Sequence, residues 1–471
     1  MRRIASLVAA LVLLLSFVPA AGAGSAPAQR AGLAQGSPGG NASVIVQTHG
    51  DPGTAMQAAA ALGARIVARW SIIDGFAAQM PEATAAALAS RPDVKRIAAD
   101  SRLQTTGRTS GGTGGVDSSS LVSSYQAAVG ATGAWSTGLT GNGIGVAVVD
   151  SGIQHSQGSG LQDLGTRVVL DVSFNSAATN QSDKYGHGTH VAGIIGGNGQ
   201  TGGGKYIGIA PKSNIFNVKF SSDDGSGTES DLISALDWVY QNRSKGIRIV
   251  NLSVTSGVAE SYTTSALDAA VEKLWTSGVV VVVSAGNLGA VADAVQYPPA
   301  NDPYVITVGA LDDQGTAALT DDTVAAWSSR GQTQDGFAKP EVLAPGAHIV
   351  SLRACDACTL MRAGPDNAVD VGYFRMGGTS MAAPMVSGTV ALLLEKNPQL
   401  TPNQVKWLLM NTGRTYSGMT GAGPKAVDAT AAVKFTGTLG TANGGLTPSG
   451  GTAGTQGGTT SNIYWLVSLD Y

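Results

Sequence analysis

The sequence is poor in the features that several kinds of protein require. The 471-residue chain has only five histidines and two cysteines, and its formal net charge is −3. That charge balance provides no basic face, so it disfavours nucleic acid as a partner. Beyond the N-terminus no apolar run is long enough to span a bilayer, and we expect no membrane span. With 13% charged residues and 65 glycines, the composition indicates a loop-rich protein rather than a highly charged helical one.

The positions of the histidines exclude one large class of hydrolases. All of them precede Ser380, which has the setting of an exposed nucleophile; they are His49, His155, His187, His190 and His348. The α/β-hydrolases place the nucleophilic serine before the acid and the histidine, so this chain does not follow their order.

Ser380 stands on a glycine turn that opens into a helix-like apolar run, in the segment GGTSMAAP at 377–384. Glycines allow a sharp turn and the close approach of a substrate, and the helix N-terminus adds unpaired N–H groups and a positive dipole. A seryl hydroxyl needs a base to become a nucleophile. This pattern therefore makes Ser380 the candidate nucleophile.

His187 is the candidate base, in the segment YGHGTHVAG at 185–193, where glycines on both sides leave the imidazole uncrowded. His190 lies one helical turn further on and is expected to be packed in the core. Two histidines at this spacing can bind zinc, but the H-E-x-x-H pattern and its glutamate are absent, which disfavours a metal site.

Asp150 is the candidate acid. It follows the apolar run IGVAVV at 144–149, which is typical of a buried parallel strand. Catalytic groups gather at the carboxyl ends of the strands in such sheets. A carboxylate there can accept the Nδ1–H of His187 and stabilise the imidazolium that forms when Ser380 loses its proton. The order along the chain is acid, base, nucleophile.

The segments VAVVDSGI, GHGTHVAG and GGTSMAAP together resemble the three active-site blocks of the subtilisin-like serine proteases, in the same order. This chain order belongs to the general description of that family. The resemblance implies a serine endopeptidase that forms an acyl-enzyme on Ser380. It also implies that Asn287, after the strand-like run 279–283, donates to the oxyanion. Taken alone, Asn287 would be interpreted as a turn residue.

The resemblance further implies a substrate cleft between two backbone edges, where an extended peptide adds as a strand. One edge comprises Gly225, Ser226 and Gly227 followed by Thr228, and the other comprises Ser253, Val254 and Thr255. The wall of the pocket for the residue before the cut comprises Ser284, Ala285 and Gly286. The family usually has glycine at the position of Thr255, so the side chain here is expected to narrow the pocket entrance.

The N-terminal part of the chain has the organisation of a secreted precursor. Residues 1–23 combine Arg2 and Arg3, an apolar run and a small-residue cleavage site, which predicts a signal peptide. Residues 42–104 show a small α+β pattern that resembles the inhibitory pro-segment of the family; a permanent accessory domain is the alternative. A Gly/Ser/Thr-rich connector at 105–120 is predicted to contain the maturation site.

The rest of the chain is predicted to be an α/β catalytic domain at 121–434, with a parallel sheet covered by helices on both faces. The expected strands include 168–172, 215–220, 247–252, 279–283 and 305–308, and the expected helices 230–240, 263–276 and 401–411. A Gly/Thr-rich linker at 435–461 and an apolar segment at 462–471 follow. The apolar segment is interpreted either as a disordered end or as a strand docked on the catalytic domain or a partner.

Cys355 and Cys358 form a lone C-x-x-C pair in a segment that looks like an insertion. A small loop disulfide is favoured over a redox pair or a metal clip, since structural zinc needs about four ligands. No organic cofactor is implied. Calcium is common in the family, but the loop at 196–205 has almost no carboxylate, so calcium stays an expectation without a location and the metal ligands are unknown.

These observations predict a secreted, self-processing serine endopeptidase. Its partners would be protein or peptide substrates and its own pro-segment, which acts as an intramolecular inhibitor. Two alternatives stay open: a catalytically silent binding or inhibitory protein whose pro-segment never leaves the cleft, and an exo-acting peptidase of the same family.

Overall fold

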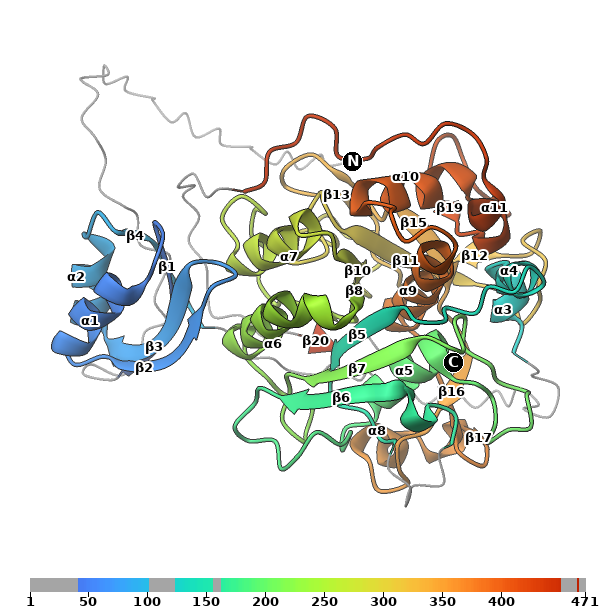
Figure 1. Cartoon of the computed structure of the whole chain (residues 1–471), viewed down its shortest axis with the longest axis horizontal. Helices are drawn as coiled ribbons and strands as arrows, with labels where there is room; N and C mark the ends of the chain where they lie inside the picture. Colours follow the sequence, from blue (N-terminus) through green and yellow to red (C-terminus); the bar gives the residue numbers. More distant parts are fainter. Residues whose placement is uncertain (1–40, 101–122, 156–161, 450–463, 466–471) are drawn as a thin grey trace, which may run out of the picture.

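The computed structural model describes residues 41–100, 123–155, 162–449 and 464–465 of the chain. Within them, a small N-terminal α+β unit lies beside a larger α/β unit (Figure 1). The predicted signal peptide at 1–23 and the predicted connector at 105–120 lie outside the described residues. No helix in these ranges is long and apolar enough to cross a membrane.

The N-terminal unit is a four-stranded antiparallel sheet, in the order β2-β3-β1-β4, with two helices. Its elements are β1 (Asn41–Thr48), α1 (Gly53–Ala61), β2 (Arg65–Trp70), β3 (Gly75–Pro81), α2 (Glu82–Ala89) and β4 (Val94–Ala99). The sequence analysis did not identify β2. Its exposed residues Arg65, Val67 and Arg69 alternate with less exposed ones, so the strand has no continuous apolar run.

Side-chain alternation along β1 gives this unit two buried faces. Val44 and Val46 are fully buried and pack with Phe76 and Leu88 in a core that belongs to the unit alone. Ile45, between them, is part of the core of the larger unit. Successive residues of a strand point to opposite faces. The unit therefore has its own core and a second apolar face that packs on its neighbour.

The larger unit is built on a sheet whose main path is parallel throughout, in the order β19-β15-β11-β10-β8-β5-β7-β6. These strands are β5 (Gly145–Asp150), β6 (Val168–Ser173), β7 (Asn214–Lys219), β8 (Ile247–Leu252), β10 (Val280–Ser284), β11 (Ile306–Asp312), β15 (Val342–Pro345) and β19 (Lys425–Ala426). Strand β12 (Thr323–Val324) adds antiparallel to β11. The α/β class predicted from the sequence is thus confirmed.

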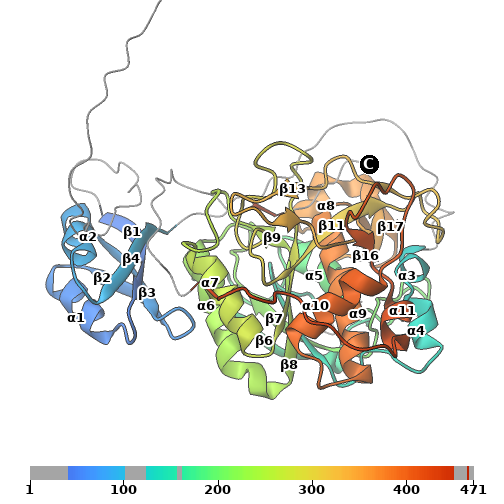
Figure 2. The same ribbon diagram turned by 90° about the horizontal axis from the view of Figure 1, so that it is seen from above.

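Helices cover both faces of this sheet, and α5 packs on α9 while α6 packs on α7 (Figure 2). The helices are α3 (Tyr125–Ala128), α4 (Ala131–Trp135), α5 (His187–Gly196), α6 (Glu229–Asn242), α7 (Ala266–Thr276), α8 (Thr359–Ala363), α9 (Thr379–Lys396), α10 (Pro402–Thr412) and α11 (Ala429–Lys434). The small strands are β9 (Val254–Thr255), β13 (Gly331–Gln332), β14 (Ala338–Lys339), β16 (Ile349–Leu352), β17 (Ala368–Asp370) and β18 (Tyr373–Met376).

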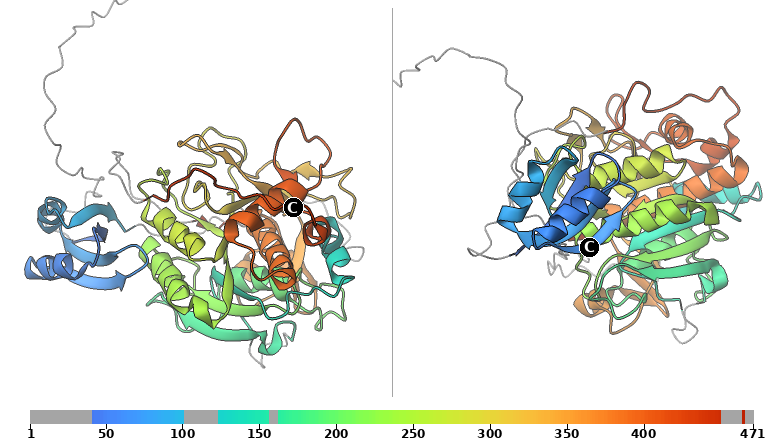
Figure 3. Two further views of the ribbon diagram at one scale, coloured as in Figure 1. Left: turned by 45° about the horizontal axis from the view of Figure 1, so that its top comes forward. Right: turned by 60° about the vertical axis from the view of Figure 1, so that its left-hand side comes forward.

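The N-terminal unit lies against α6 (Figure 3), and hydrogen bonds to side chains of this helix hold it there. The Nε1–H of Trp70 donates to Ser234 Oγ at 2.8 Å. The backbone N–H groups of Ser71 and Ile72 donate to Oδ1 of Asp237 at 3.1 and 2.9 Å. A buried carboxylate that receives backbone donors forms strong hydrogen bonds, so this contact fixes the unit on the helix.

The chain after α11 departs from the expectation of a free linker over 435–461. Up to residue 449 it is held on the larger unit: Asn443 Nδ2 donates to the carbonyl of Tyr304 at 3.0 Å, and Ser449 donates to Glu272. The composition did not show this, because a few asparagine and serine side chains supply the contacts. Further on, β20 (Tyr464–Trp465) pairs with β9, as in the alternative of a docked strand.

Candidate active site

The four residues singled out as catalytic stand at the carboxyl-end edge of the parallel sheet. Asp150 is the last residue of β5, and Asn287 follows β10 by three positions. His187 is the first residue of α5, and Ser380 is the second residue of α9. This edge is where open parallel sheets gather functional groups.

Asp150 and His187 form a hydrogen-bonded pair sealed from solvent. His187 Nδ1 lies 2.8 Å from Asp150 Oδ1, and both side chains are 0% exposed. The backbone N–H of Ser151 also donates to this Oδ1, at 2.7 Å. A carboxylate at Nδ1 selects the imidazole tautomer whose Nε2 can accept a proton. The pair therefore has the arrangement of an oriented general base.

Asp183 organises both members of this pair, and the sequence analysis did not find it. Its carboxylate is buried and accepts from Ser151 Oγ at 2.9 Å, from Gly186 N at 2.6 Å and from both the N–H and hydroxyl of Thr189. Burial raises its pKa, and these donors oppose that rise. The signal in the sequence that could have indicated this role is that Asp183 lies four residues before His187.

His190 is buried one turn after His187, as expected. Its Nε2 lies 3.0 Å from the carbonyl of Phe374 and 3.2 Å from that of Ile349. Burial lowers the pKa of the ring to about 3. His190 is therefore a neutral core side chain that fixes α5 against β16 and β18.

Ser380 lies beside a polar network at the start of α9. Its Oγ donates to the carbonyl of Ser253 at 3.2 Å, and the Ser253 hydroxyl donates in return to the carbonyl of Ser380 at 3.0 Å. Gly378, the residue before the helix, has φ of +144°, which side chains other than glycine rarely adopt. The glycine thus lets the chain enter α9 so that the hydroxyl faces this network.

Asn287 is oriented by Thr379, the neighbour of the nucleophile. The side-chain Oδ1 of Asn287 accepts from the N–H of Thr379 at 3.1 Å and from its hydroxyl at 3.0 Å. The oxygen is thereby occupied, and the Nδ2 amide is the group left to donate. An amide donor beside the nucleophile is what an oxyanion site requires. The sequence analysis did not identify the role of Thr379.

The two predicted substrate edges have different surroundings. Val254 and Thr255 form β9, and the Thr255 hydroxyl lies 3.4 Å from the carbonyl of Pro298. The other edge, Gly225–Gly227, forms a tight turn in which the N–H of Ser222 donates to the carbonyl of Ser226. A side chain at Gly225 would strike the ring of Tyr185, which keeps this position small.

The predicted pocket wall joins the nucleophile region. Ser284 ends β10, Ala285 is buried, and the N–H of Gly286 donates to the hydroxyl of Thr379 at 3.1 Å. Gly286 has φ of +109°, and a Cβ there would lie 2.7 Å from Ser329 Oγ. This wall is therefore linked to the same threonine that orients Asn287.

Cys355 and Cys358 form a disulfide in the structure. The segment that carries it packs on the loop before His187, since the N–H groups of Thr359 and Leu360 donate to the carbonyls of Lys184 and Tyr185. The small loop therefore supports the approach to α5.

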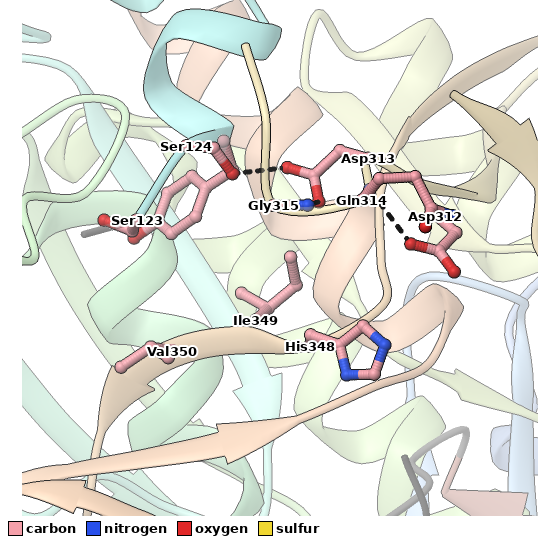
Figure 4. A pocket seen from close by; sticks show the side chains of 10 residues that line it. Ser123, Ser124, Asp312, Asp313, Gln314, Gly315, His348, Ile349 and Val350 are labelled. Carbon is pink, nitrogen blue, oxygen red and sulfur yellow. Dashed lines mark hydrogen bonds between the residues drawn. The ribbon is translucent and has the colours of Figure 1, made fainter. Parts of the chain in front are cut away.

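Figure 4 shows a cavity of about 180 Å³ between the segments 123–125, 312–315 and 348–350. Ser124, Asp313 and His348 are among its lining residues, and Ser124 donates to Asp313 at 2.7 Å. None of the predicted catalytic residues lines it. No group of three or more metal-ligating side chains suited to an ion occurs in the part of the chain that the structure describes, so the expectation of calcium remains without a location.

Comparisons with known proteins match this geometry. The sequence profile described as Subtilase family matches residues 141–436. Serine protease AprX of Bacillus subtilis (strain 168) is 42% identical over 280 residues, which cover 58% of this chain and 62% of that protein. Subtilisin DY of Bacillus licheniformis is 35% identical over 277 residues, covering 58% of this chain and 85% of that protein.

Two further matches extend the picture. The Extracellular serine proteinase of Thermus sp. (strain Rt41A) is 31% identical over 367 residues, which cover 78% of this chain and 77% of that protein. A solved structure described as a cold adapted subtilisin-like serine proteinase aligns with a TM-score of 0.48 and 32% identity, over 62% of this chain and 90% of that chain. Because the profile matches more than half of the chain and its range includes all four candidate catalytic residues, this chain belongs to the subtilase family of serine peptidases.

Proposed function

We propose that this protein is a secreted serine endopeptidase, made as a self-processing precursor, with Ser380 as nucleophile and His187 and Asp150 as its activating pair. The observation that carries the proposal is the fully buried contact between His187 Nδ1 and Asp150, at the sheet edge where Ser380 stands in the first turn of α9. A buried, oriented imidazole at a serine on a helix N-terminus is suited to acyl transfer.

The chemistry follows from these positions. Ser380 Oγ attacks the carbonyl carbon of the scissile peptide bond while Nε2 of His187 takes its proton, and Asp150 stabilises the resulting imidazolium. The charge that develops on the carbonyl oxygen is met by the Asn287 amide and the Ser380 N–H. The imidazolium then protonates the leaving amine, and water hydrolyses the acyl-enzyme by the same steps in reverse.

The substrate is an extended peptide that lies along β9. The Ser253 carbonyl, which contacts the nucleophile, directly precedes Val254 and Thr255. A peptide that adds to this edge has its reacting bond directed toward Ser380. Within this cleft, Ser284–Gly286 form the wall of the pocket before the cut.

Residues 42–104 act as the inhibitory pro-segment, and the bond that matures the enzyme lies in the connector. The unit's own hydrophobic core and its contacts with α6 support this role. A unit that folds by itself and docks on the catalytic domain can stay bound after the connecting chain is cut. Export is supported by the sequence at 1–23, by the disulfide, which persists in oxidising compartments, and by the printed name of the Thermus relative.

A fluorophosphonate probe tests the proposal directly, because it reacts with activated serines. We expect labelling of Ser380 and hydrolysis of a peptide amide in the processed enzyme, and neither in a His187→Ala variant. The matched control is His155→Ala, which removes an imidazole that contacts Asp171 outside the site and should keep both signals. A processed, folded chain that takes no label at Ser380 would instead identify a silent binding protein.

A further inference from the structure

The edge β9 is paired with the C-terminal end of the chain. In the described residues, β9 and β20 form a two-stranded sheet by themselves. The pairing is antiparallel, with Tyr464 opposite Thr255 and Trp465 opposite Val254. In Figure 1, β20 is drawn within the larger unit and not on the N-terminal unit.

This pairing lies next to the nucleophile. β20 runs from Thr255 toward Val254, and the next residue of the domain in that direction is Ser253. The Ser253 carbonyl accepts from Ser380 Oγ at 3.2 Å. A strand bound here therefore covers the backbone groups that a peptide would need when its reacting bond approaches Ser380.

We propose that the C-terminal segment is a tethered competitor of substrate: Tyr464–Trp465 occupy the peptide-binding edge at Val254–Thr255 by β-addition. The proposal rests on the proposed function for the location of the cleft. It commits to the chain's own end as the occupant, because that end is the segment seated on the edge.

The chain before the segment is anchored close enough for such competition. Ser449 donates through its N–H and its hydroxyl to Oε2 of the buried Glu272, at 2.7 and 2.5 Å. Only residues 450–463, rich in Gly and Thr, lie between this anchor and β20. Because this short stretch joins β20 to its anchor, the pairing with β9 is intramolecular, and an intramolecular partner can compete with free peptide even when its own affinity is low.

The N-terminal unit does not fill the same edge in the part of the chain that is described. Its contacts are with α6 and with Glu260, which forms an ion pair with Arg96. Among the described residues, the N-terminal unit and the tail therefore contact different surfaces, and the tail can still restrain the enzyme after the pro-segment has left.

The test compares the full chain with a chain that ends at Ser449, both after maturation and with the intact C-terminus of the full chain verified by mass spectrometry. On a short chromogenic peptide we expect equal kcat and a KM about twofold to tenfold higher for the full chain. The double variant Tyr464→Pro/Trp465→Pro, which removes the backbone donors of β20, should have the KM of the truncated chain. Thr455→Pro, in the linker, is the matched control and should keep the higher KM.

Equal KM values for two active chains would overturn the tail proposal and leave the proposed function intact. Loss of hydrolysis and of fluorophosphonate labelling in both chains would overturn the proposed function instead. A readout independent of catalysis then decides the docking: hydrogen exchange on the full Ser380→Ala chain should show protection at Tyr464–Trp465. The proline pair should abolish this protection, and unprotected amides in the parent would refute the docking.

Discussion

The two ends of the chain meet the same catalytic domain in opposite ways. The N-terminal unit folds around its own core, which includes Val44 and Phe76, and uses side chains to hold α6. The C-terminal segment brings two residues that pair through their backbone with β9. The N-terminal unit brings a core of its own to the contact, whereas the C-terminal segment brings only two residues whose backbone must be ordered on the edge.

The two attachments therefore differ in kind: the N-terminal unit is held by hydrogen bonds to side chains of α6, and the C-terminal segment by a two-residue backbone pairing. The contact of the N-terminal unit includes three bonds to one buried carboxylate, Asp237. The contact of the tail depends on tethering for its strength. The predictions below separate these two attachments from the chemistry and from each other.

The largest effect is expected from Ser380→Ala, which removes the attacking atom and should lower kcat by about 10⁶. The variant should fold and should accumulate with the pro-segment still joined, as followed by electrophoresis and N-terminal sequencing. Ser387→Ala, a buried serine on the same helix, is the control and should mature. Normal trimming of the Ser380→Ala chain in a host without other proteases would show that the cut is not its own.

Asn287→Ala should lower kcat by about 10²–10³ with little change in KM, because only the developing oxyanion loses a donor. Steady-state kinetics on a peptide amide measure this split. The variant should retain both terminal attachments, since Asn287 contacts Thr379 and neither end of the chain. An unchanged kcat would remove Asn287 from the oxyanion site.

Much of this architecture could be predicted from the sequence, for physical reasons. Parallel strands that are buried on both faces appear in the sequence as continuous apolar runs. The predicted bounds of β5, β8 and β10 therefore agree with the observed ones to within about one residue. The active-site motifs then indicated which strand ends carry the candidate catalytic residues. Strand β2 was missed because edge strands alternate exposed and less exposed residues.

The supporting residues of the site could not be predicted in the same way. Asp183 and Thr379 act through contacts between segments that are distant in sequence. The spacing of residues along the chain does not reveal which donors will form hydrogen bonds with a given carboxylate or amide. The residues after α11 show the same limit. Their composition is that of a linker, yet the hydroxyl of Ser449 donates to the buried carboxylate of Glu272.

Asp237→Ala should weaken the attachment of the N-terminal unit at least about tenfold to hundredfold, because even one bond to a charged acceptor contributes about 1.5–3 kcal/mol and Asp237 accepts three. The measurement is the lag between self-cleavage and the appearance of activity, which should shorten accordingly. Asp237→Asn keeps an acceptor oxygen and should restore much of the lag. An unchanged lag in Asp237→Ala would mean that the N-terminal unit is not held at α6. The effect of the tail on KM should be the same in the parent, Asp237→Ala and Asp237→Asn chains.

The smallest effect concerns pH and the carboxylates where the N-terminal unit meets α6. Burial, together with repulsion from Glu260 and Asp100, raises the pKa of Glu229 to about 8, and Arg96 opposes this rise. Burial also raises the pKa of Asp100, whose carboxylate accepts from Ser230. When the N-terminal unit leaves, the Glu229 carboxyl loses the repulsion from Asp100 and should become more exposed to water. The pKa of Glu229 should therefore fall in the released enzyme.

The sign follows from linkage. A carboxyl group whose pKa is higher in the complex favours the complex when protonated, so this contribution is full at low pH and is lost as pH rises from about 4.5 through about 8. The lag before activity should therefore be longer at pH 5.5 than at pH 8.5. Glu229→Gln should flatten this dependence, while Glu82→Gln, on α2 of the N-terminal unit, should leave it unchanged.

The backbone pairing of the tail involves no titratable group, so the KM ratio between full and truncated chains should stay constant over the same range. A lag that lengthens with rising pH would contradict the assignment of Glu229 to this contact.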